Sequence, residues 1–435
     1  MLDSLPLHAR FAEATYVDEE DMNHLRMILV AVLAFGEAGA IWAQSPPPPG
    51  AFPSANALLQ SSPEPTIIIG DNASPNVPRM WFHWGVGMQW VNPSPYPAPL
   101  VTTSVPADAG IIGNPTTTVL LGQTTVDYGR LGFFYFGSGA WFNPERTVGT
   151  EGSSTWSEQR SRHAIFESDA FGNPGLYRPV IDPVTQTETS MVIADPLNVA
   201  GTFIFESRIR VNNSDANLLF NIARDEARAV TAMVGYRIAY MREEMRLIQS
   251  STALFDGALQ FLGNPLLAGD TLTIRDRIET VNRIYAGQVG LRLERYLGRL
   301  YLAGTGKLGI GWSNQRIFGD GRTTLEPDVQ TVPGGGVVQP SFPYRNQVED
   351  FIFIPEVGAT VRFRMLRRLH LSASYNFTWF SSVSRPGSYV DRVVQFSQVP
   401  HSTGYTGVVG TRPQFVESDH DMYLHGFQAG LTWIY

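Results

Sequence analysis

Apolar and polar residues alternate with a period of two through most of the chain beyond residue 80. The clearest example is LHLSASYNFTWF at 369–380, where one face is apolar and the other carries small and polar residues. The same alternation occurs in 80–90, 230–240, 285–294, 300–312, 356–364 and 423–435. A period of two is typical of a β-strand with one apolar face. Strands are also expected near 131–142, 147–157 and 202–224, where the alternation is weaker and the faces stay open.

The connections between these strands alternate in length. Short ones fall near 143–146, 224–227, 296–299 and 366–368. Long ones, rich in Pro, Gly, Asn, Asp, Ser and Thr, fall near 91–130, 158–201, 244–280, 315–349 and 382–421. Tight periplasmic turns and long external loops are typical of outer-membrane barrels. The pattern predicts an all-β, antiparallel transmembrane barrel of about ten strands, or twelve if 202–224 hides a hairpin, with both ends on the periplasmic side.

A soluble β-sandwich is the alternative, because its strands also alternate. Three features favour the membrane: an almost purely apolar face opposite charged residues, the alternating loop lengths, and a predicted secretory signal. The apolar faces also end in aromatic residues, which suits an interfacial girdle: Trp90, Trp312, Trp379, Trp433 and Tyr435. Since a bilayer does not tolerate unpaired strand edges, the sheet is expected to close on itself.

Composition narrows the possible chemistry. Only 17% of the residues are charged, below the roughly 25% usual in soluble domains. There is no cysteine, which excludes disulfides, thiolate metal sites and cysteine nucleophiles. A net charge of −8 argues against a nucleic-acid partner. We expect no cofactor and no metal.

The N-terminal part has a different pattern. Residues 1–21 are polar and acidic and are interpreted as a non-native extension; MNHLRMILVAVLAFGEAGAIWA, at 22–43, is interpreted as a secretory signal peptide. Its apolar run is shorter than the about 20 residues of a transmembrane helix. A buried N-terminal helix is the alternative. Residues 44–79 are rich in proline and predict an extended periplasmic linker, leaving 80–435 as the barrel.

Charged residues opposite the apolar faces are the candidates for lining the lumen: Arg237, Arg292, Glu294, Lys307, Glu356, Arg362 and Arg364. At the end of the chain, alternate apolar residues mark the lipid face of a last strand that must pair with the first. A terminal aromatic strand resembles the signal read by the barrel-assembly machinery, here Phe427, Leu431, Trp433 and Tyr435. Expected partners are therefore outer-membrane lipid, that machinery and small solutes.

Several motifs together resemble the seventh porin-like β-barrel family, typical of planctomycete bacteria. They are PLVTTS with GIIGNPTTTVLLG (99–122), GYRIAYMREE (235–244), YAGQVGLRLE (285–294), FIPEVGATV (353–361) and SYNFTWFSSVSRPGSYVD (374–391). The resemblance covers about 80–435 and implies an outer-membrane barrel with a pore and no catalytic residues. It also implies a single long strand at 202–224, which supports ten strands.

The function expected from these features is a porin or channel for small solutes. The alternative is a barrel filled by lumen ion pairs that acts structurally or binds partners through its external loops. An enzyme would need a catalytic cluster, and the best candidate is Asp419, His420 and Asp421, where alternation separates the histidine from the two carboxylates. We expect no enzymatic activity. PGGGVV at 333–338 is interpreted as a flexible loop tip, and SRPGSYVD at 384–391 as a turn in an external loop.

Overall fold

The structure is a computed structural model that describes residues 79–342, 345–415 and 418–435. The predicted N-terminal extension, the signal peptide and all of the proline-rich linker except Arg79 lie outside the described residues. Among the residues that the structure describes, no helix is long and apolar enough to cross a membrane. The account below concerns the compact unit that contains residues 79–435.

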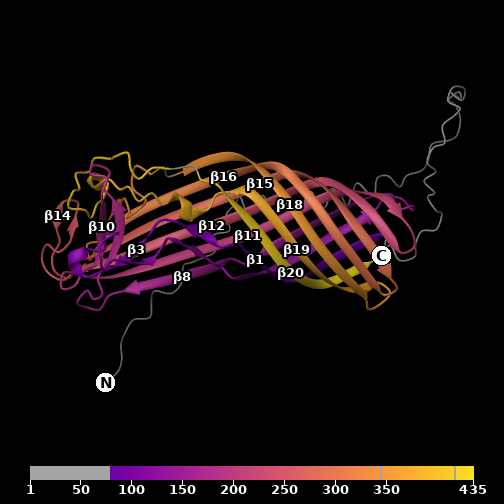
Figure 1. The fold of residues 1–435 in the computed structure, drawn as a ribbon, viewed down its shortest axis with the longest axis horizontal. Coiled ribbons are helices and arrows are strands. Elements are labelled where there is room, and N and C mark those ends of the chain that lie inside the picture. The colour runs from indigo at the N-terminus through magenta and orange to yellow at the C-terminus, as the bar shows by residue number, and fades with distance from the viewer. Residues whose placement is uncertain (1–78, 343–344, 416–417) are drawn as a thin grey trace, which may run out of the picture. The chain divides into compact units, whose positions relative to one another are not determined.

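Ten strands of the described chain form a closed antiparallel ring (Figure 1). In chain order they are β1 (Met80–Val91), β6 (Arg130–Trp141), β7 (Val148–Ser157), β11 (Val199–Arg224), β12 (Arg228–Ala253), β15 (Thr271–Leu297), β16 (Leu300–Glu326), β18 (Arg345–Arg364), β19 (Leu369–Val383) and β20 (His420–Ile434). The last strand closes the ring against the first, with Phe82 opposite Trp433. The prediction of ten strands is confirmed, and 202–224 lies within the single strand β11.

The outward face of the ring is apolar and exposed. Val86, Trp312 and Phe427 leave 65%, 65% and 60% of their surfaces uncovered. Further outward residues of this kind are Phe82, Val234, Leu291, Leu293, Val357, Phe363 and Trp433. A continuous apolar surface of this extent is unfavourable in water and is the expected lipid contact of a barrel wall. The faces assigned from alternation are therefore correct.

Four tight turns join the strands at the end of the ring where the chain also terminates. They cover 142–147, 225–227, 298–299 and 365–368, close to the predicted positions. The shortest joins β15 to β16 through Gly298 and Arg299, and Gly298 has a φ of 62°, which glycine adopts without strain. In the 225–227 turn, the Asp225 carboxylate accepts hydrogen bonds from the amides of Ala227 and Arg228, both at 2.7 Å. We call this the periplasmic end, following the usual topology of such barrels.

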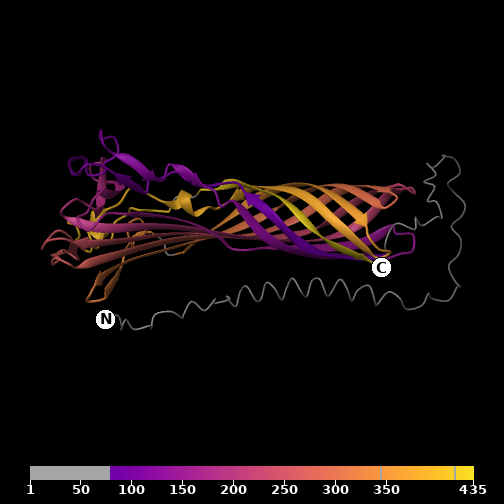
Figure 2. The same cartoon turned by 90° about the horizontal axis from the view of Figure 1, so that it is seen from below.

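At the other end, β11, β12, β15 and β16 continue well past the neighbouring strands. They contain 26 or 27 residues, against 12 in β1. β8 (Arg160–Glu167) pairs with the outer part of β11, and β17 (Gln330–Pro333) with β16. The connecting segments lie on one side of this extended sheet (Figure 2). Much of the sequence predicted as loop at 244–280 and 315–349 is therefore strand, which corrects that expectation.

The remaining elements are short and lie in the external connections. They are β2 (Ser94–Tyr96), β3 (Val101–Thr103), η1 (Pro106–Asp108), β4 (Thr118–Leu121), β5 (Thr124–Val126), β9 (Leu176–Ile181), β10 (Glu188–Ala194), β13 (Gln260–Phe261), β14 (Asn264–Pro265), η2 (Pro386–Tyr389) and η3 (Phe396–Gln398). β10, β9, β3 and β4 form a four-stranded sheet of their own. Apolar side chains of the connections pack against the extended strands in a buried core that includes Leu176, Ile193, Phe203, Met245 and Ile278.

The glycine-rich segment 333–338 is not a flexible tip, so that interpretation is wrong. Gly336, Val337 and Val338 donate backbone hydrogen bonds of 3.0, 3.1 and 2.9 Å to Asp276 Oδ1. Asp276 Oδ2 also pairs at 2.7 Å with Arg178, and both side chains are almost fully buried. A Cβ on Gly336 would lie 1.5 Å from Arg178 Nη1, so only glycine leaves room for the guanidinium. The glycines serve close packing around a buried ion pair.

Candidate functional site

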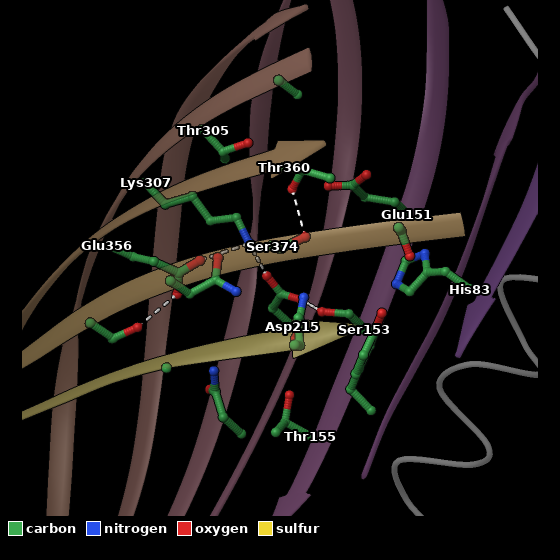
Figure 3. A pocket seen from close by; sticks show the side chains of 18 of the residues that line it. His83, Glu151, Ser153, Thr155, Asp215, Thr305, Lys307, Glu356, Thr360 and Ser374 are labelled. Carbon is green, nitrogen blue, oxygen red and sulfur yellow. Dashed lines mark hydrogen bonds and ion pairs between the residues drawn. The ribbon is translucent and has the colours of Figure 1, made fainter. Parts of the chain in front are cut away.

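Charged side chains from neighbouring strands meet in the middle of the lumen. Asp215 on β11, Arg237 on β12, Lys307 on β16 and Glu356 on β18 all point inward (Figure 3 labels Asp215, Lys307 and Glu356). Arg237 Nη2 lies 2.5 Å from Glu356 Oε2 and 3.9 Å from Asp215 Oδ2. Lys307 pairs with Asp215 and lies 3.4 Å from Glu356 Oε1. We call these four side chains the ionic layer; two cations and two carboxylates neutralise one another there.

A second ion pair bridges other strands of the ring. Arg292 on β15 donates to Glu151 on β7, at 2.8 Å from Nη1 to Oε2 and 2.5 Å from Nη2 to Oε1. This bidentate geometry is the strong form of an arginine–carboxylate contact. His83 on β1 also faces this space, and Gly137 on β6 makes room for its ring, because a Cβ there would lie 2.2 Å from His83 Nε2.

The ionic layer and the Arg292–Glu151 pair line a cavity of about 210 Å³, which we call the central cavity. Most of its lining is polar and comes from all around the ring, including Ser153, Thr155, Thr305, Thr360 and Ser374 (Figure 3). Ser153 donates a 2.5 Å hydrogen bond to Asp215, and the Thr360 and Ser374 hydroxyls lie 2.9 Å apart. Hydrogen bonds and ion pairs hold much of this lining in place, which limits the width of the lumen.

A larger cavity of about 680 Å³ occupies the periplasmic end of the lumen, and we call it the basic vestibule. Among the described residues, its lining contains eight arginines and five aromatic residues, Trp81, Trp141, Tyr296, Tyr301 and Tyr435. The arginines are Arg79, Arg146, Arg292, Arg299, Arg362, Arg364, Arg367 and Arg368. Trp81, Arg292, Tyr301 and Arg362 line both cavities, so the two hollows adjoin along the lumen.

Above the central cavity, inward side chains become apolar. We call this cluster the apolar layer: Val91, Tyr128, Leu131, Ile209, Val211, Ala239, Met241, Ile284, Ala286, Ile352, Ile354, Phe380, Val383, Met422 and Leu424. Leu131, Ile284, Ile352, Ile354 and Phe380 have no exposed surface. Val211 and Leu424 also line the central cavity, so the layer forms its roof. The lumen is thus hollow at the periplasmic end and packed at the outer end.

The external loop at 384–391 reinforces this closure. Arg385 is fully buried and donates from Nε to Glu243 Oε2 at 2.9 Å, while Tyr128 donates to Glu243 Oε1 at 2.7 Å. Arg385 also donates to the carbonyl oxygen of Asn92 at 3.1 Å. A segment interpreted as an external turn therefore inserts its arginine into the top of the barrel and ties the β1–β6 and β19–β20 connections to strand β12.

All seven charged residues proposed from the sequence line these cavities. Arg237, Arg292, Lys307, Glu356 and Arg362 line the central cavity, and Arg292, Glu294, Arg362 and Arg364 line the basic vestibule. Sequence reasoning missed Asp215 and Glu151, the carboxylates that neutralise Lys307 and Arg292. Asp215 lies in the polar run NNSDAN (212–217), where both faces are polar and the period of two is hidden. The available signal was the imbalance of five proposed inward cations against only two proposed carboxylates, because buried charges need partners of opposite sign.

The candidate catalytic residues do not form a cluster. His420 Nε2 lies 2.5 Å from the Ser388 hydroxyl, whereas Asp421 accepts a 3.2 Å hydrogen bond from Trp379 on the outward face. Within the described part of the chain, no group of three or more histidine and acidic side chains could hold a metal ion. His420 and Asp421 therefore lie on opposite faces of β20, as the alternation in the sequence predicted.

These features define a class: a closed antiparallel barrel of ten strands in the bacterial outer membrane, with a polar lumen above short periplasmic turns. The chain belongs to the family described as Putative beta barrel porin-7 (BBP7), whose model matches residues 80–435. The family resemblance drawn from the sequence motifs is confirmed. A search of the curated proteins finds no match.

Solved outer-membrane barrels are distantly similar. The outer membrane protease OmpT from Escherichia coli shares 10% identity over 82% of this chain and 96% of its own, with a TM-score of 0.38. A Pseudomonas aeruginosa FadL homologue shares 9% identity over 84% and 92%, with a TM-score of 0.19. An anion-selective porin from Comamonas acidovorans shares 8% over 82% and 98%, with a TM-score of 0.16. Scores this low carry no argument about solute or activity.

Proposed function

We propose that the protein is a narrow channel for small hydrophilic solutes, closed at its outer end in the state described here. The observation that carries this proposal is the hollow, polar inner face that runs from the basic vestibule through the central cavity to the apolar layer. Apolar constrictions close pores by excluding water. Passage then requires the apolar layer and the Arg385 loop to move apart.

The dimensions favour small solutes. Barrels of about eight strands are filled by side chains and wide porins use 16–18, so ten strands leave a narrow passage. The ionic layer is balanced in charge, whereas arginines dominate the entrance below it. Rings of arginine favour anions in pores. We therefore propose small anions as the preferred solutes.

Single-channel recording in planar bilayers tests the proposal. Phe380→Ala removes a fully buried side chain from the apolar layer and is expected to increase the frequency or size of conductance steps over wild type. Phe377→Ala, on the outward face of the same strand, is the matched control and is expected to conduct like wild type. If neither wild type nor Phe380→Ala conducts, the channel proposal fails.

We further propose that the protein has no enzymatic activity, which the dispersed Asp419, His420 and Asp421 side chains support. A second candidate function is binding of a partner through the external connections. It is favoured by their separate four-stranded sheet and buried core, which present a shaped surface outside the barrel. Shortening the β9–β10 connection at 182–187, which belongs to this sheet, would then abolish cell-surface attachment while leaving conductance unchanged; attachment that survives the change would refute this candidate.

We propose that the outward face of β20 is the assembly signal, with outer-membrane lipid and the assembly machinery as partners. Phe427, Trp433 and Tyr435 present 60%, 41% and 68% of their surfaces outward, and Leu431 lies between them. The double variant Trp433→Ala, Tyr435→Ala is expected to reduce the heat-modifiable barrel in outer-membrane fractions. Ile434→Ala, which alters the vestibule face of the same strand, is the control. Equal yields from both variants would refute the signal.

A further inference from the structure

The basic vestibule has far more positive than negative charge. Within the part of the chain that the structure describes, its lining contains eight arginines and His370, but one acidic side chain, Glu294. Glu294 already accepts hydrogen bonds from Tyr301 at 2.6 Å and Thr231 at 3.3 Å. Arg292 is neutralised by Glu151 on the side of the central cavity. Arg299, Arg362 and Arg364 therefore face a hollow in which Glu294 is the one acidic side chain among the described residues.

Three of these arginines have no carboxylate partner. Among the described residues, no ion pair joins Arg299, Arg362 or Arg364 to an acidic group. Elsewhere in the same lumen, Arg237, Arg292 and Lys307 each pair with a carboxylate. The absence of such partners in the vestibule is thus a local property rather than a general feature of the lumen.

Aromatic rings hold two guanidinium groups in position. Arg362 Cζ lies 4.5 Å from the centre of the Tyr301 ring, and Arg368 Cζ lies 5.2 Å from that of Tyr435. Stacking of this kind fixes the planar group while leaving its N–H donors available. The Arg364 backbone also donates a 2.9 Å hydrogen bond to the Arg299 carbonyl, which ties the 298–299 turn to β18. The Arg362 and Arg368 side chains are therefore held in place before any ligand arrives.

The positive charges are crowded. Burial, and to a lesser extent the charge of Arg79, lowers the pKa of the Arg146 guanidinium in the 142–147 turn, against an opposing effect of Tyr296. The Arg79 charge is the smallest of these three influences, and an anion bound beside it would offset that repulsion. The exposed residues Arg299 and Arg367 lie at the mouth, so the vestibule reaches solvent at the periplasmic end.

We propose that the basic vestibule is a binding site for a small multivalent oxyanion of the oligophosphate class. Arginine forks match phosphate oxygens in pairs, and a volume of about 680 Å³ holds more than one phosphate group together with its substituent. Several guanidinium groups around one hollow favour several negative charges over one. Binding needs only the periplasmic mouth, so the site functions whether or not the apolar layer opens.

Titration calorimetry with inorganic pyrophosphate, on the folded chain in a non-ionic detergent, tests the proposal. Wild type is expected to show saturable binding that weakens with added salt, since the contacts are charged. Arg362→Gln and Arg364→Gln are each expected to weaken binding about tenfold or more, because each removes a charge-assisted hydrogen-bond donor. Arg322→Gln, on the exposed outer part of β16, is the matched control and is expected to bind like wild type. A heat-modifiability gel confirms that each variant is folded.

Absence of saturable heat with wild type, or equal affinity for pyrophosphate in Arg362→Gln, Arg364→Gln and wild type, would overturn the site. Repeating the titration in vesicles with and without phosphatidylglycerol identifies the source of the phosphate. Weaker pyrophosphate binding in anionic vesicles assigns the site to lipid headgroup phosphates, and unchanged binding assigns it to a soluble molecule. Conductance is measured separately: a protein that binds but never conducts refutes only the channel, and one that conducts without binding refutes only this site.

Discussion

The two halves of β12 carry opposite polarity on the same two faces. In the lower half, the outward residues Val234 and Tyr236 are apolar and exposed, and the inward Arg237 is charged and buried. In the upper half, the outward residues are Arg242, Glu244 and Arg246, while the inward ones include Met241, Met245 and Leu247. The same reversal occurs in β15, where Leu291 and Leu293 face outward below, and Arg275 and Arg277 face outward above.

The reversal locates the membrane boundary. Below it the solvent is hydrocarbon, so apolar side chains face outward and polar ones are gathered in the lumen. Above it the solvent is water, and the same strands follow the rule of soluble proteins, with apolar side chains buried under the connecting segments. One continuous strand therefore lies partly in hydrocarbon and partly in water. At the boundary, the types of residue on its outward and inward faces are exchanged.

The largest effect is expected at the buried ion pair of the external half. Asp276→Asn keeps the side chain's shape but leaves Arg178 buried without a counter-charge, which costs about 3–5 kcal/mol. Hydrogen exchange of 333–342 is expected to rise, because Asp276 accepts the amides of Gly336, Val337 and Val338. Heat-modifiability of the membrane half is expected to stay unchanged. Asp320→Asn removes an exposed pairing with Arg322 and is the control; equal exchange in both variants would contradict the assignment.

A charge on the lipid-facing half comes next. Leu291→Arg places a cation on the outward face of β15, where burial in hydrocarbon costs about 2–4 kcal/mol near the bilayer centre. Thr273→Arg makes a similar change on the outward face of the same strand, in the external half, and is expected to cost less than about 0.5 kcal/mol. Unfolding by urea in lipid vesicles measures both. Similar losses of unfolding free energy for the two variants would show that the membrane boundary lies elsewhere on the strand.

The reversal also explains how far the sequence could be interpreted. Alternation below the boundary predicted the strands and their lipid faces, and the seven charged residues that it placed inward line the two cavities. In 244–253, 271–280 and 315–326 the period of two continues. The apolar residues there lie on the inward face, however, and charged residues occupy the outward positions that are apolar lower in the same strands. These regions therefore resembled polar loops. The buried role of PGGGVV could not be predicted either, because its partner Asp276 lies about 60 residues away in the chain.

A smaller, pH-dependent effect is expected in the external half. Burial, with a contribution from Arg178, lowers the pKa of His401 from 6.5 to about 3, and neither ring nitrogen has a hydrogen-bond partner among the described residues. The unfolded segment binds a proton below pH 6.5 while the folded one does not. Its stability is therefore full above about pH 6.5 and falls as the pH drops toward about 3.

At pH 5 the loss of stability is about 2 kcal/mol, given 1.36 kcal/mol per pKa unit. Comparing hydrogen exchange of 396–404 in wild type and His401→Phe, at pH 7 and at pH 5, isolates the effect. The difference between the two proteins is expected to grow on acidification. His163→Phe, which changes an exposed histidine on β8, is the control. A difference that is independent of pH would refute a buried neutral imidazole.

The smallest effect is expected on the outward face of the external half. Arg277 pairs with Glu244 and Glu279, and its side chain is 40% exposed. Arg277→Gln leaves Glu244 paired with Arg246 and Glu279 with Arg242, so the loss is about 1 kcal/mol or less and shrinks with added salt. Urea unfolding at low and high ionic strength measures it. A loss of several kcal/mol that salt does not reduce would mean that this face is covered rather than solvated. The membrane boundary would then lie nearer the outer end of the strands than the reversal of polarity indicates.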